Sequence, residues 1–234
     1  MNFTEHEAGA ECYLETGTAF PDATLVTCMA ANTVLHGAAG LPGVLYPDGT
    51  KAGQDFSMQI RAGLDLYANI RPIHLLAGGP QRLSGIQPGA GRFTIVREYT
   101  EGLYAAHGAG NILRGDTATD TLVLTRMEIE RIVHMAAIIA RNGDGAPEDG
   151  VKRVSIVDKA NALRSYTFFR TVADEVLAGY PDIEVEHVIV DAMIVHMIER
   201  PQHFDAIVCE NLFGDILSDL GAANTGGMGL APSV

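Results

Sequence analysis

The residues most suited to chemistry lie in the segment ENLFGDILSD, residues 210–219, directly after the apolar run AIVC. If this segment is helical, Asp215 and Asp219 share one face, with their side chains about 5–6 Å apart. Carboxylates at that spacing repel, and no lysine or arginine follows them up to Val234. Oxygen ligands of this kind suit Mg²⁺ or Mn²⁺. The alternative is a solvated acidic helix start, which the helix dipole favours.

Two further candidates follow predicted strands. Lys159 comes after the apolar run VSIV and Asp158, and Asp191 follows the run VIV. Ligand sites in α/β sheets gather at the carboxyl ends of strands. A partly desolvated lysine there can have its pKa lowered enough to act as a base, although an exposed loop lysine is the alternative. Asp191 would be a third carboxylate for Mg²⁺ beside the 215/219 pair.

Three arginines and a tyrosine complete the candidates. Arg61 lies within a predicted helix, Arg71 in a strand before Pro72, and Arg97 near the end of the strand RFTIVRE. Arginine binds carboxylates through two parallel hydrogen bonds, although each of these could equally be a salt-bridge partner or solvated. Convergence on one pocket would indicate a di- or tricarboxylic substrate. Tyr104 could be a general acid, although a buried, hydrogen-bonded tyrosine is the commoner role.

Composition and missing motifs exclude several classes. The chain has 234 residues, and its net charge of −13 argues against nucleic acid or an anionic membrane as the main partner. Three widely spaced cysteines without CxxC indicate neither a disulfide framework nor a zinc site. The sequence shows no signal-peptide pattern and no run long enough to cross a membrane, so we expect a cytoplasmic protein. No GxGxxG opens a helix after a strand, so a standard Rossmann site is not expected.

The helices and strands that must position these residues are indicated by the hydrophobic pattern, which alternates along the chain between a helical period and a strand-like pattern. Helices are predicted at 21–31, 56–67, 126–142 and 163–179. Strands are predicted at 33–40, 70–76, 92–98, 152–158, 183–190 and 204–209, with a short helix between the last two. This alternation predicts an α/β fold with a mostly parallel sheet. The loop 41–54 is long enough for a working role, and 104–125 is either a subunit-pairing arm or a surface excursion.

Five strings together resemble the β-decarboxylating dehydrogenases, the family of isopropylmalate, isocitrate, homoisocitrate and tartrate/D-malate dehydrogenases. They are DLYANIRP (65–72), VREYTEG (96–102), VDKAN (157–161), VDAM (190–193) and NLFGDILSDLGAANTGGMGLAPS (211–233). Their order and spacing are family-like and cover essentially the whole chain. The family's opening strand with GDGIGPE and its later HGSAPDIAGKG-type loop have no counterpart here. We therefore expect a family member that lacks its first β/α unit and its C-terminal part.

The resemblance implies a role for each candidate. Arg61, Arg71 and Arg97 would bind substrate carboxylates, and Asp191, Asp215 and Asp219 would hold Mg²⁺ or Mn²⁺. Lys159 would be the base for the substrate hydroxyl, and Tyr104 would protonate the enol carbon after CO₂ leaves. Leu41 and Gln54, in the loop that would line the cofactor cleft, and Asn161 would bind NAD, with NADP not excluded.

The resemblance also implies the organisation of the whole protein. Residues 1–66 would belong to the first, cofactor-side domain, 67–225 to a second domain with the substrate and metal site, and 226–234 to a return to the first. Lys159 and Asp191 would serve the neighbouring subunit, so a homodimer with shared active sites is implied, with 104–125 as the dimer arm.

The residues expected to contact the variable group of the substrate give mixed indications of which substrate is bound. Met58 suits isopropylmalate and Ser57 partly suits isocitrate, whereas LSGIQPG (83–89) is similar to the tartrate/D-malate branch. VDKAN and VDAM favour isopropylmalate. We therefore expect NAD-dependent oxidative decarboxylation of a malate-type 2-hydroxy diacid, with 3-isopropylmalate first. Tartrate/D-malate and isocitrate/homoisocitrate activities, or a non-catalytic truncated member, are the alternatives.

Overall fold

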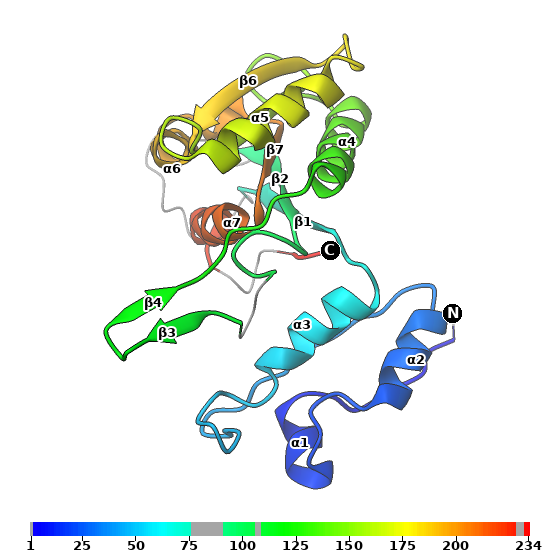
Figure 1. The fold of residues 1–234 in the computed structure, drawn as a ribbon. Coiled ribbons are helices and arrows are strands. Elements are labelled where there is room, and N and C mark those ends of the chain that lie inside the picture. Colours follow the sequence, from blue (N-terminus) through cyan, green and yellow to red (C-terminus); the bar gives the residue numbers. More distant parts are fainter. Residues whose placement is uncertain (1, 76–90, 106–108, 228–231) are drawn as a thin grey trace. The chain divides into compact units, whose positions relative to one another are not determined.

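The computed structural model of the chain describes residues 2–75, 91–105, 109–227 and 232–234 (Figure 1). It divides into two compact units, Met1–Leu66 and Tyr67–Val234, and each is described by itself. The string LSGIQPG (83–89) lies outside the described residues. The assignment of the parts to a cofactor-side domain, a catalytic domain and a returning segment stays a prediction.

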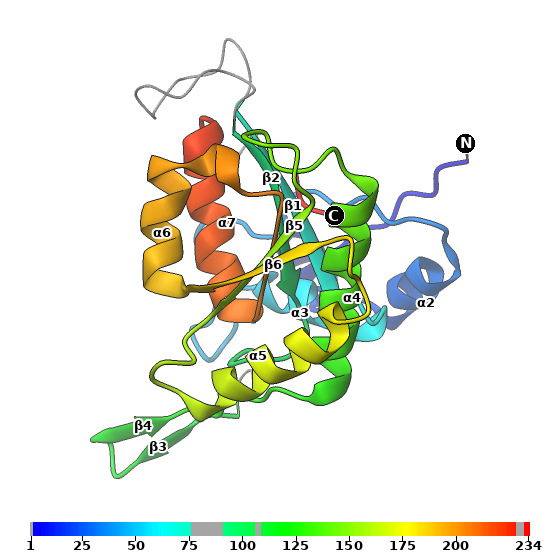
Figure 2. The ribbon, with the colours of Figure 1, turned by 90° about the horizontal axis from the view of Figure 1, so that it is seen from above.

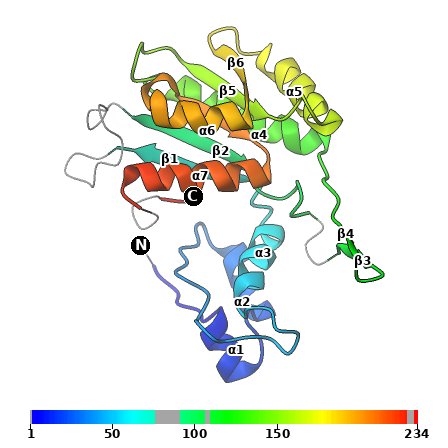
Figure 3. The ribbon, with the colours of Figure 1, turned by 90° about the vertical axis from the view of Figure 1, so that its left-hand side faces the viewer.

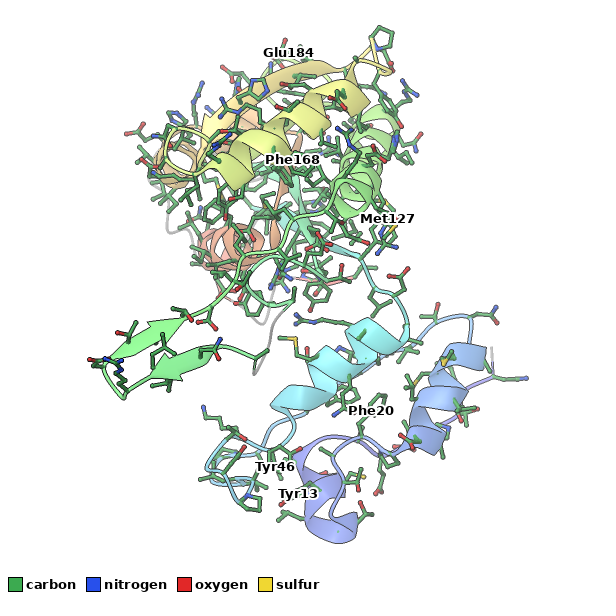
Figure 4. The ribbon with its side chains drawn as sticks, in the orientation of Figure 1. Tyr13, Phe20, Tyr46, Met127, Phe168 and Glu184 are labelled. Carbon is green, nitrogen blue, oxygen red and sulfur yellow. The ribbon has the colours of Figure 1, made fainter. Side chains whose placement is uncertain are left out.

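The first unit contains three short helices. They are α1 (Ala10–Thr16), α2 (Asp22–Ala30) and α3 (Gln54–Gly63). Its small core consists of Phe20, Phe56 and Ile60, with the two phenyl rings edge to face at 4.9 Å. Tyr13 and Tyr46 pack edge to face at 4.7 Å (Figure 4).

Two features of this unit differ from the sequence prediction. The segment 33–40 forms no strand and is largely exposed, with Leu35 at 93%. A strand needs a neighbouring strand, and the carbonyl of Ala39 instead accepts a hydrogen bond from Ala10 N at 2.7 Å. The prediction of a buried strand there is wrong, and no helix was predicted at α1.

Gly53 has φ +87° and an added Cβ would lie 2.2 Å from the Ala39 carbonyl oxygen, so only glycine fits before α3.

The second unit is built on a five-stranded sheet in the order β1-β2-β7-β5-β6. Its strands are β1 (Ala68–His74), β2 (Arg92–Glu98), β5 (Arg153–Asp158), β6 (Glu184–Ile189) and β7 (Ala206–Cys209). The pair β1/β2 is antiparallel, and the other three pairings are parallel. The predicted α/β fold with a mostly parallel sheet is confirmed.

Helices cover both faces of this sheet (Figure 2). Helices α4 (Arg126–Asn142) and α5 (Arg164–Leu177) pack on one face, and α6 (Val190–Glu199) and α7 (Asn211–Thr225) on the other, with a short 3₁₀ turn η1 (Pro201–His203) before β7. Successive strand residues alternate between the two cores, since Val96 packs in the α4/α5 core and Ile95 in the α6/α7 core. The parallel strands β2, β5 and β7 therefore read as continuous apolar runs.

A hairpin extends from this unit between β2 and α4 (Figure 3). Its strands β3 (Asn111–Leu113) and β4 (Thr117–Thr119) pair antiparallel, and all their residues are exposed. Residues 114–116 connect the strands, and Arg114 and Gly115 both have positive φ, as the central positions of a type I′ β-turn require. The role of segment 104–125 as a dimer arm stays a prediction. None of the described helices is long and apolar enough to span a membrane.

Candidate active site

Helix α7 is set directly at the carboxyl end of β7 by Glu210. Its buried carboxylate accepts hydrogen bonds from Leu212 N at 3.0 Å and Phe213 N at 2.8 Å, which caps the helix. Burial raises the pKa of Glu210, opposed by these backbone donors and by a hydrogen bond from Tyr166. Tyr166 also stacks on Phe213, with ring centroids 4.8 Å apart. The start of α7 is therefore held from both the sheet and α5.

Both aspartates lie in helix α7, as the sequence predicts. Asp215 is 43% exposed in its side chain, and Asp219 is exposed one turn further on. Their roles as metal ligands stay predictions. Hard carboxylate oxygens at this spacing fit two positions of a Mg²⁺ or Mn²⁺ shell.

Arg97, near the end of β2, reaches Asp215 from the sheet. Its side chain is 5% exposed, and Nη1 donates to Asp215 Oδ1 at 2.5 Å. Nε and Nη2 both donate to Asn211 Oδ1, at 3.0 and 2.7 Å. Gly214 makes this approach possible, because an added Cβ would lie 2.4 Å from Arg97 Cγ. Opposite charge and close packing thus join β2 and α7 here.

Tyr104 contacts the same carboxylate. Its hydroxyl donates to Asp215 Oδ2 at 3.0 Å. The loop before it is tied down by Glu98, whose buried carboxylate accepts from Thr100 N at 2.7 Å and Glu101 N at 2.8 Å. The two oxygens of Asp215 are therefore occupied by a cation on one side and a phenol on the other.

Arg71 lies diagonally across from Arg97 on the same face of the sheet. Arg71 pairs with Ile95 in the β1/β2 register, and Ile95 and Arg97 point to one side because they are two residues apart. This is the side covered by α7, since Ile73 on β1 contacts Gly221. The Nε of Arg71 is buried without a hydrogen-bond partner among the described residues. An unpaired buried N–H at this point fits an anionic ligand.

Lys159 and Asp191 form a second, separate pair. Lys159 follows β5, its Nζ donates to Asp191 Oδ1, and their side chains are 29% and 69% exposed. The turn before Lys159 is fixed by Asp158, which accepts two bonds of 2.7 Å from Arg170 and one of 2.8 Å from Ala160 N. The hydrogen bond from Lys159 lowers the pKa of Asp191.

The structure thus brings together Arg71, Arg97, Tyr104 and Asp215, and separately Lys159 and Asp191. Within the described ranges no group of three or more histidine, cysteine or acidic side chains could hold a metal, so Asp191 does not join the 215/219 pair within one chain. Its contribution from a second subunit stays a prediction.

The roles of the other predicted residues stay predictions. Arg61 near the end of α3, exposed Leu41, and Gln54 at the start of α3 belong to the first unit, and their link to the site stays a prediction. Asn161, exposed in the turn after β5, stays a predicted cofactor contact.

Sequence reasoning missed three supporting residues. No role was predicted for Asn211, Glu210 or Tyr166. Asn211 accepts hydrogen bonds from Arg97, Glu210 caps α7, and Tyr166 donates to Glu210. The signal for the first two was their position, because polar residues directly after a buried strand and at the first turn of a helix must find partners. No signal in the sequence pointed to Tyr166, since its contact joins segments far apart in the chain.

Comparison with known proteins identifies the family of this chain. The family model for isocitrate/isopropylmalate dehydrogenase matches residues 1–234. The 3-isopropylmalate dehydrogenases of Priestia megaterium and Shouchella clausii are 39% and 41% identical over all of this chain, which spans 62% and 63% of their lengths.

Solved structures show the same fold. The isocitrate dehydrogenase of Methylococcus capsulatus has a TM-score of 0.76 at 34% identity, over 97% of this chain and 63% of that one. A Thermus thermophilus protein has a TM-score of 0.83 at 29% identity, over 97% of this chain and 43% of that one. The resemblance drawn from the five strings is confirmed, and the chain belongs to the isocitrate/isopropylmalate dehydrogenase family.

Proposed function

We propose that the protein containing this chain catalyses the metal-dependent, NAD-linked oxidative decarboxylation of a malate-type 2-hydroxy diacid, with 3-isopropylmalate as the first candidate. The observation that carries this proposal is the meeting of Arg97, Tyr104 and Asp215 at the start of α7. A carboxylate-binding cation, a proton donor and a metal-type ligand come from three different segments to one point. The 3-isopropylmalate dehydrogenases among the relatives support the choice of substrate.

Substrate binding would fall to the arginines. Arg71 and Arg97 on one face of the sheet present guanidinium groups to the two carboxylates of a diacid. Arg61 would add a third contact from the first unit. Because both strand arginines are held by the backbone of neighbouring strands, the distance between them is set before a ligand binds.

The proton transfers would use Lys159 and Tyr104. Lys159 would take the proton of the substrate hydroxyl. NAD⁺, when bound, would supply the acceptor for the two electrons and the hydrogen of that carbon, and the oxidised product would be a β-keto acid. CO₂ then leaves, and the Tyr104 hydroxyl delivers a proton to the carbon that lost it. Tyr104 is already ordered by its hydrogen bond to Asp215 at 3.0 Å.

A divalent cation would be held by Asp215 and Asp219, with Asp191 of a second copy. It would supply Lewis-acid polarisation of the substrate oxygens and neutralise negative charge that develops on them. Leu41, Gln54 and Asn161 would contact NAD. The shared ligand set makes a homodimer part of the proposal, and a cytoplasmic location goes with it.

Isocitrate is the second candidate substrate. The similarity to the Methylococcus capsulatus isocitrate dehydrogenase, at 34% identity and a TM-score of 0.76, favours it. Isocitrate carries a third carboxylate in place of the apolar group of isopropylmalate, so the two substrates place opposite demands on the residues near Arg61.

An activity screen tests the proposal. The full gene product is assayed with isopropylmalate, isocitrate, D-malate and tartrate, with NAD⁺ or NADP⁺, and with Mg²⁺ or Mn²⁺. We expect the highest kcat/KM with isopropylmalate and NAD⁺, and loss of activity in chelator. Absence of reduced nicotinamide with every substrate, together with no NAD⁺ binding in titration calorimetry, would identify a non-catalytic family member.

The variant Asp215→Asn gives a more specific test of the metal-dependent site. It should weaken diacid binding in Mg²⁺, whereas Asp174→Asn, which changes a surface pair with His187, should leave binding unchanged. Diacid binding that is independent of Mg²⁺ and insensitive to Asp215→Asn would instead indicate a simple anion-binding protein.

A further inference from the structure

Asn211 is fully buried at the junction of three segments. Its Oδ1 accepts two hydrogen bonds from Arg97 on β2, and its Nδ2 donates to the backbone oxygen of Glu101 at 2.9 Å. Asn211 itself is the first residue of α7. Because each end of the amide has a partner of the matching kind, the side chain has one orientation that satisfies both ends.

This orientation determines how the guanidinium of Arg97 is presented. Nε and Nη2 form one edge of the group, and both are turned to Asn211 Oδ1, while Nη1 donates to Asp215. A guanidinium has five N–H groups, and three of them are accounted for by these bonds within the described part of the chain. The other two N–H groups, one on Nη1 and one on Nη2, take no part in these bonds and would be the donors to an anion.

The neutrality of the amide is as important as its geometry. In the described ranges, Asp215 is the carboxylate that forms an ion pair with Arg97. An aspartate at 211 could accept the same two hydrogen bonds, but the added charge would leave Arg97 between two carboxylates. Its second oxygen would also face the Glu101 carbonyl, which needs a donor. The neutral amide of Asn211 orients the Arg97 guanidinium without neutralising its positive charge.

Neighbouring atoms restrict the rotation of the Asn211 side chain. Gly102 has φ +79°, and an added Cβ there would lie 3.1 Å from Asn211 Cβ and 2.7 Å from the Glu210 carboxylate. Glu210 caps the same helix turn through Leu212 N and Phe213 N. The amide therefore cannot turn without moving the helix start or the loop that carries Tyr104.

We propose that Asn211 is a positioning residue for Arg97: it fixes the plane of the guanidinium and leaves its positive charge for a substrate carboxylate. The part about substrate rests on the function proposed above. The part about Arg97 does not, because it concerns hydrogen bonds present without ligand.

The first test observes Arg97 directly. In the full gene product, exchange of the Arg97 Nε proton with water is followed by NMR, in wild type and in Asn211→Ala. Loss of the acceptor should speed this exchange by about tenfold or more, since a hydrogen bond to a charged group contributes about 1.5–3 kcal/mol. Asn224→Ala is the matched control, because it removes another buried amide of α7, bonded to Met197 O at 3.4 Å, without touching Arg97. Equally slow exchange in wild type and Asn211→Ala would overturn the proposal.

The second test measures diacid affinity in Mg²⁺ by calorimetry, together with KM and kcat. Asn211→Ala should weaken binding about tenfold and Asn211→Asp about a hundredfold, with KM affected more than kcat. A merely structural role predicts the reverse order, since aspartate is closer to asparagine in shape than alanine is. If Asn211→Asp does not fold, Asn211→Ser takes its place, with affinity expected between alanine and wild type.

The outcomes separate the two proposals. Wild type that binds a diacid, with Asn211→Ala and Asn211→Asp within about twofold of it, overturns the role of Asn211 and leaves the proposed function standing. Wild type that binds none of the diacids overturns the proposed function and with it the substrate part of the inference, while the exchange of the Arg97 proton still decides the positioning.

Discussion

The two groups of candidate residues in the second unit are built in opposite ways. Around Arg97 the side chains are packed between β2 and α7, with Arg97 5% exposed and fixed by three hydrogen bonds. Lys159 and Asp191 form one ion pair, with side chains 29% and 69% exposed. The first group is packed within one chain, whereas the second is more exposed and stands on a turn that Asp158 helps to fix. This difference is what a site completed by a second subunit would require, because the residues that cross to a partner must stay accessible.

The largest expected effect is that of Arg97→Ala. It removes the partner of Asp215 and leaves the buried Oδ1 of Asn211 without a donor, at a cost in unfolding free energy of about 2 kcal/mol. Diacid affinity should fall by about a hundredfold or more, because a charged hydrogen-bonding partner is lost. Urea unfolding and calorimetry measure the two effects.

Arg92→Ala is the matched control on the same strand. Arg92 pairs with Asp144, and the two side chains are 43% and 80% exposed. Its loss should cost less than about 1 kcal/mol and leave affinity unchanged. Equal effects of the two variants would contradict the view that the group around Arg97 is preorganised.

Asp158→Asn tests the base of the second group. The buried carboxylate accepts from Arg170 and Ala160 N, so losing its charge should cost about 2 kcal/mol in urea unfolding. Asp182→Asn changes a similar pair of hydrogen bonds from Arg141, but there the side chains are 44% and 50% exposed, so it should cost clearly less than Asp158→Asn. A cost below that of the surface pair would show that the turn before Lys159 does not depend on Asp158.

The two groups should also respond to pH in opposite directions. Burial raises the pKa of Glu210, so its contribution to stability is present below the ordinary carboxyl pKa and is lost as pH rises through the folded-state pKa. The hydrogen bond from Lys159 lowers the pKa of Asp191, so its contribution is present above the ordinary pKa and is lost as pH falls through the folded-state pKa.

Unfolding by urea over a series of acidic to neutral pH values measures this contrast. Glu210→Gln should flatten the decline in stability on the higher-pH side, and Asp191→Asn should flatten the loss on the acid side. A Glu210→Gln curve parallel to wild type would show that the carboxyl is not protonated more readily in the folded state.

Lys159→Met should have the smallest effect on stability. It breaks an ion pair whose Asp191 partner is exposed, so the change should lie below about 1 kcal/mol, although turnover should be lost if Lys159 is the base. Stability from urea unfolding and turnover from the activity screen are compared in the same preparation. A loss of stability as large as that from Arg97→Ala would remove the distinction between the two groups.

The amino-acid sequence determined the features that depend on local pattern. The apolar periods predicted α4, α5 and the five strands of the main sheet, and the spacing of Asp215 and Asp219 placed both in one helix. The position of Lys159 after an apolar run placed it at a strand end. Five strings in order determined the family. These inferences succeed because helix and strand periods, and polar residues after buried runs, are properties of neighbouring residues.

The tertiary structure decided everything that needs a partner distant in the chain. TVLHGAAG has the composition of a strand, but Ala39 hydrogen-bonds to Ala10 instead of to another strand. Arg71 and Arg97 became neighbours only through the antiparallel β1/β2 register. Asn211 acquired its importance only where α7 meets β2, because the worth of a buried polar group is set by which donors and acceptors the fold brings against it.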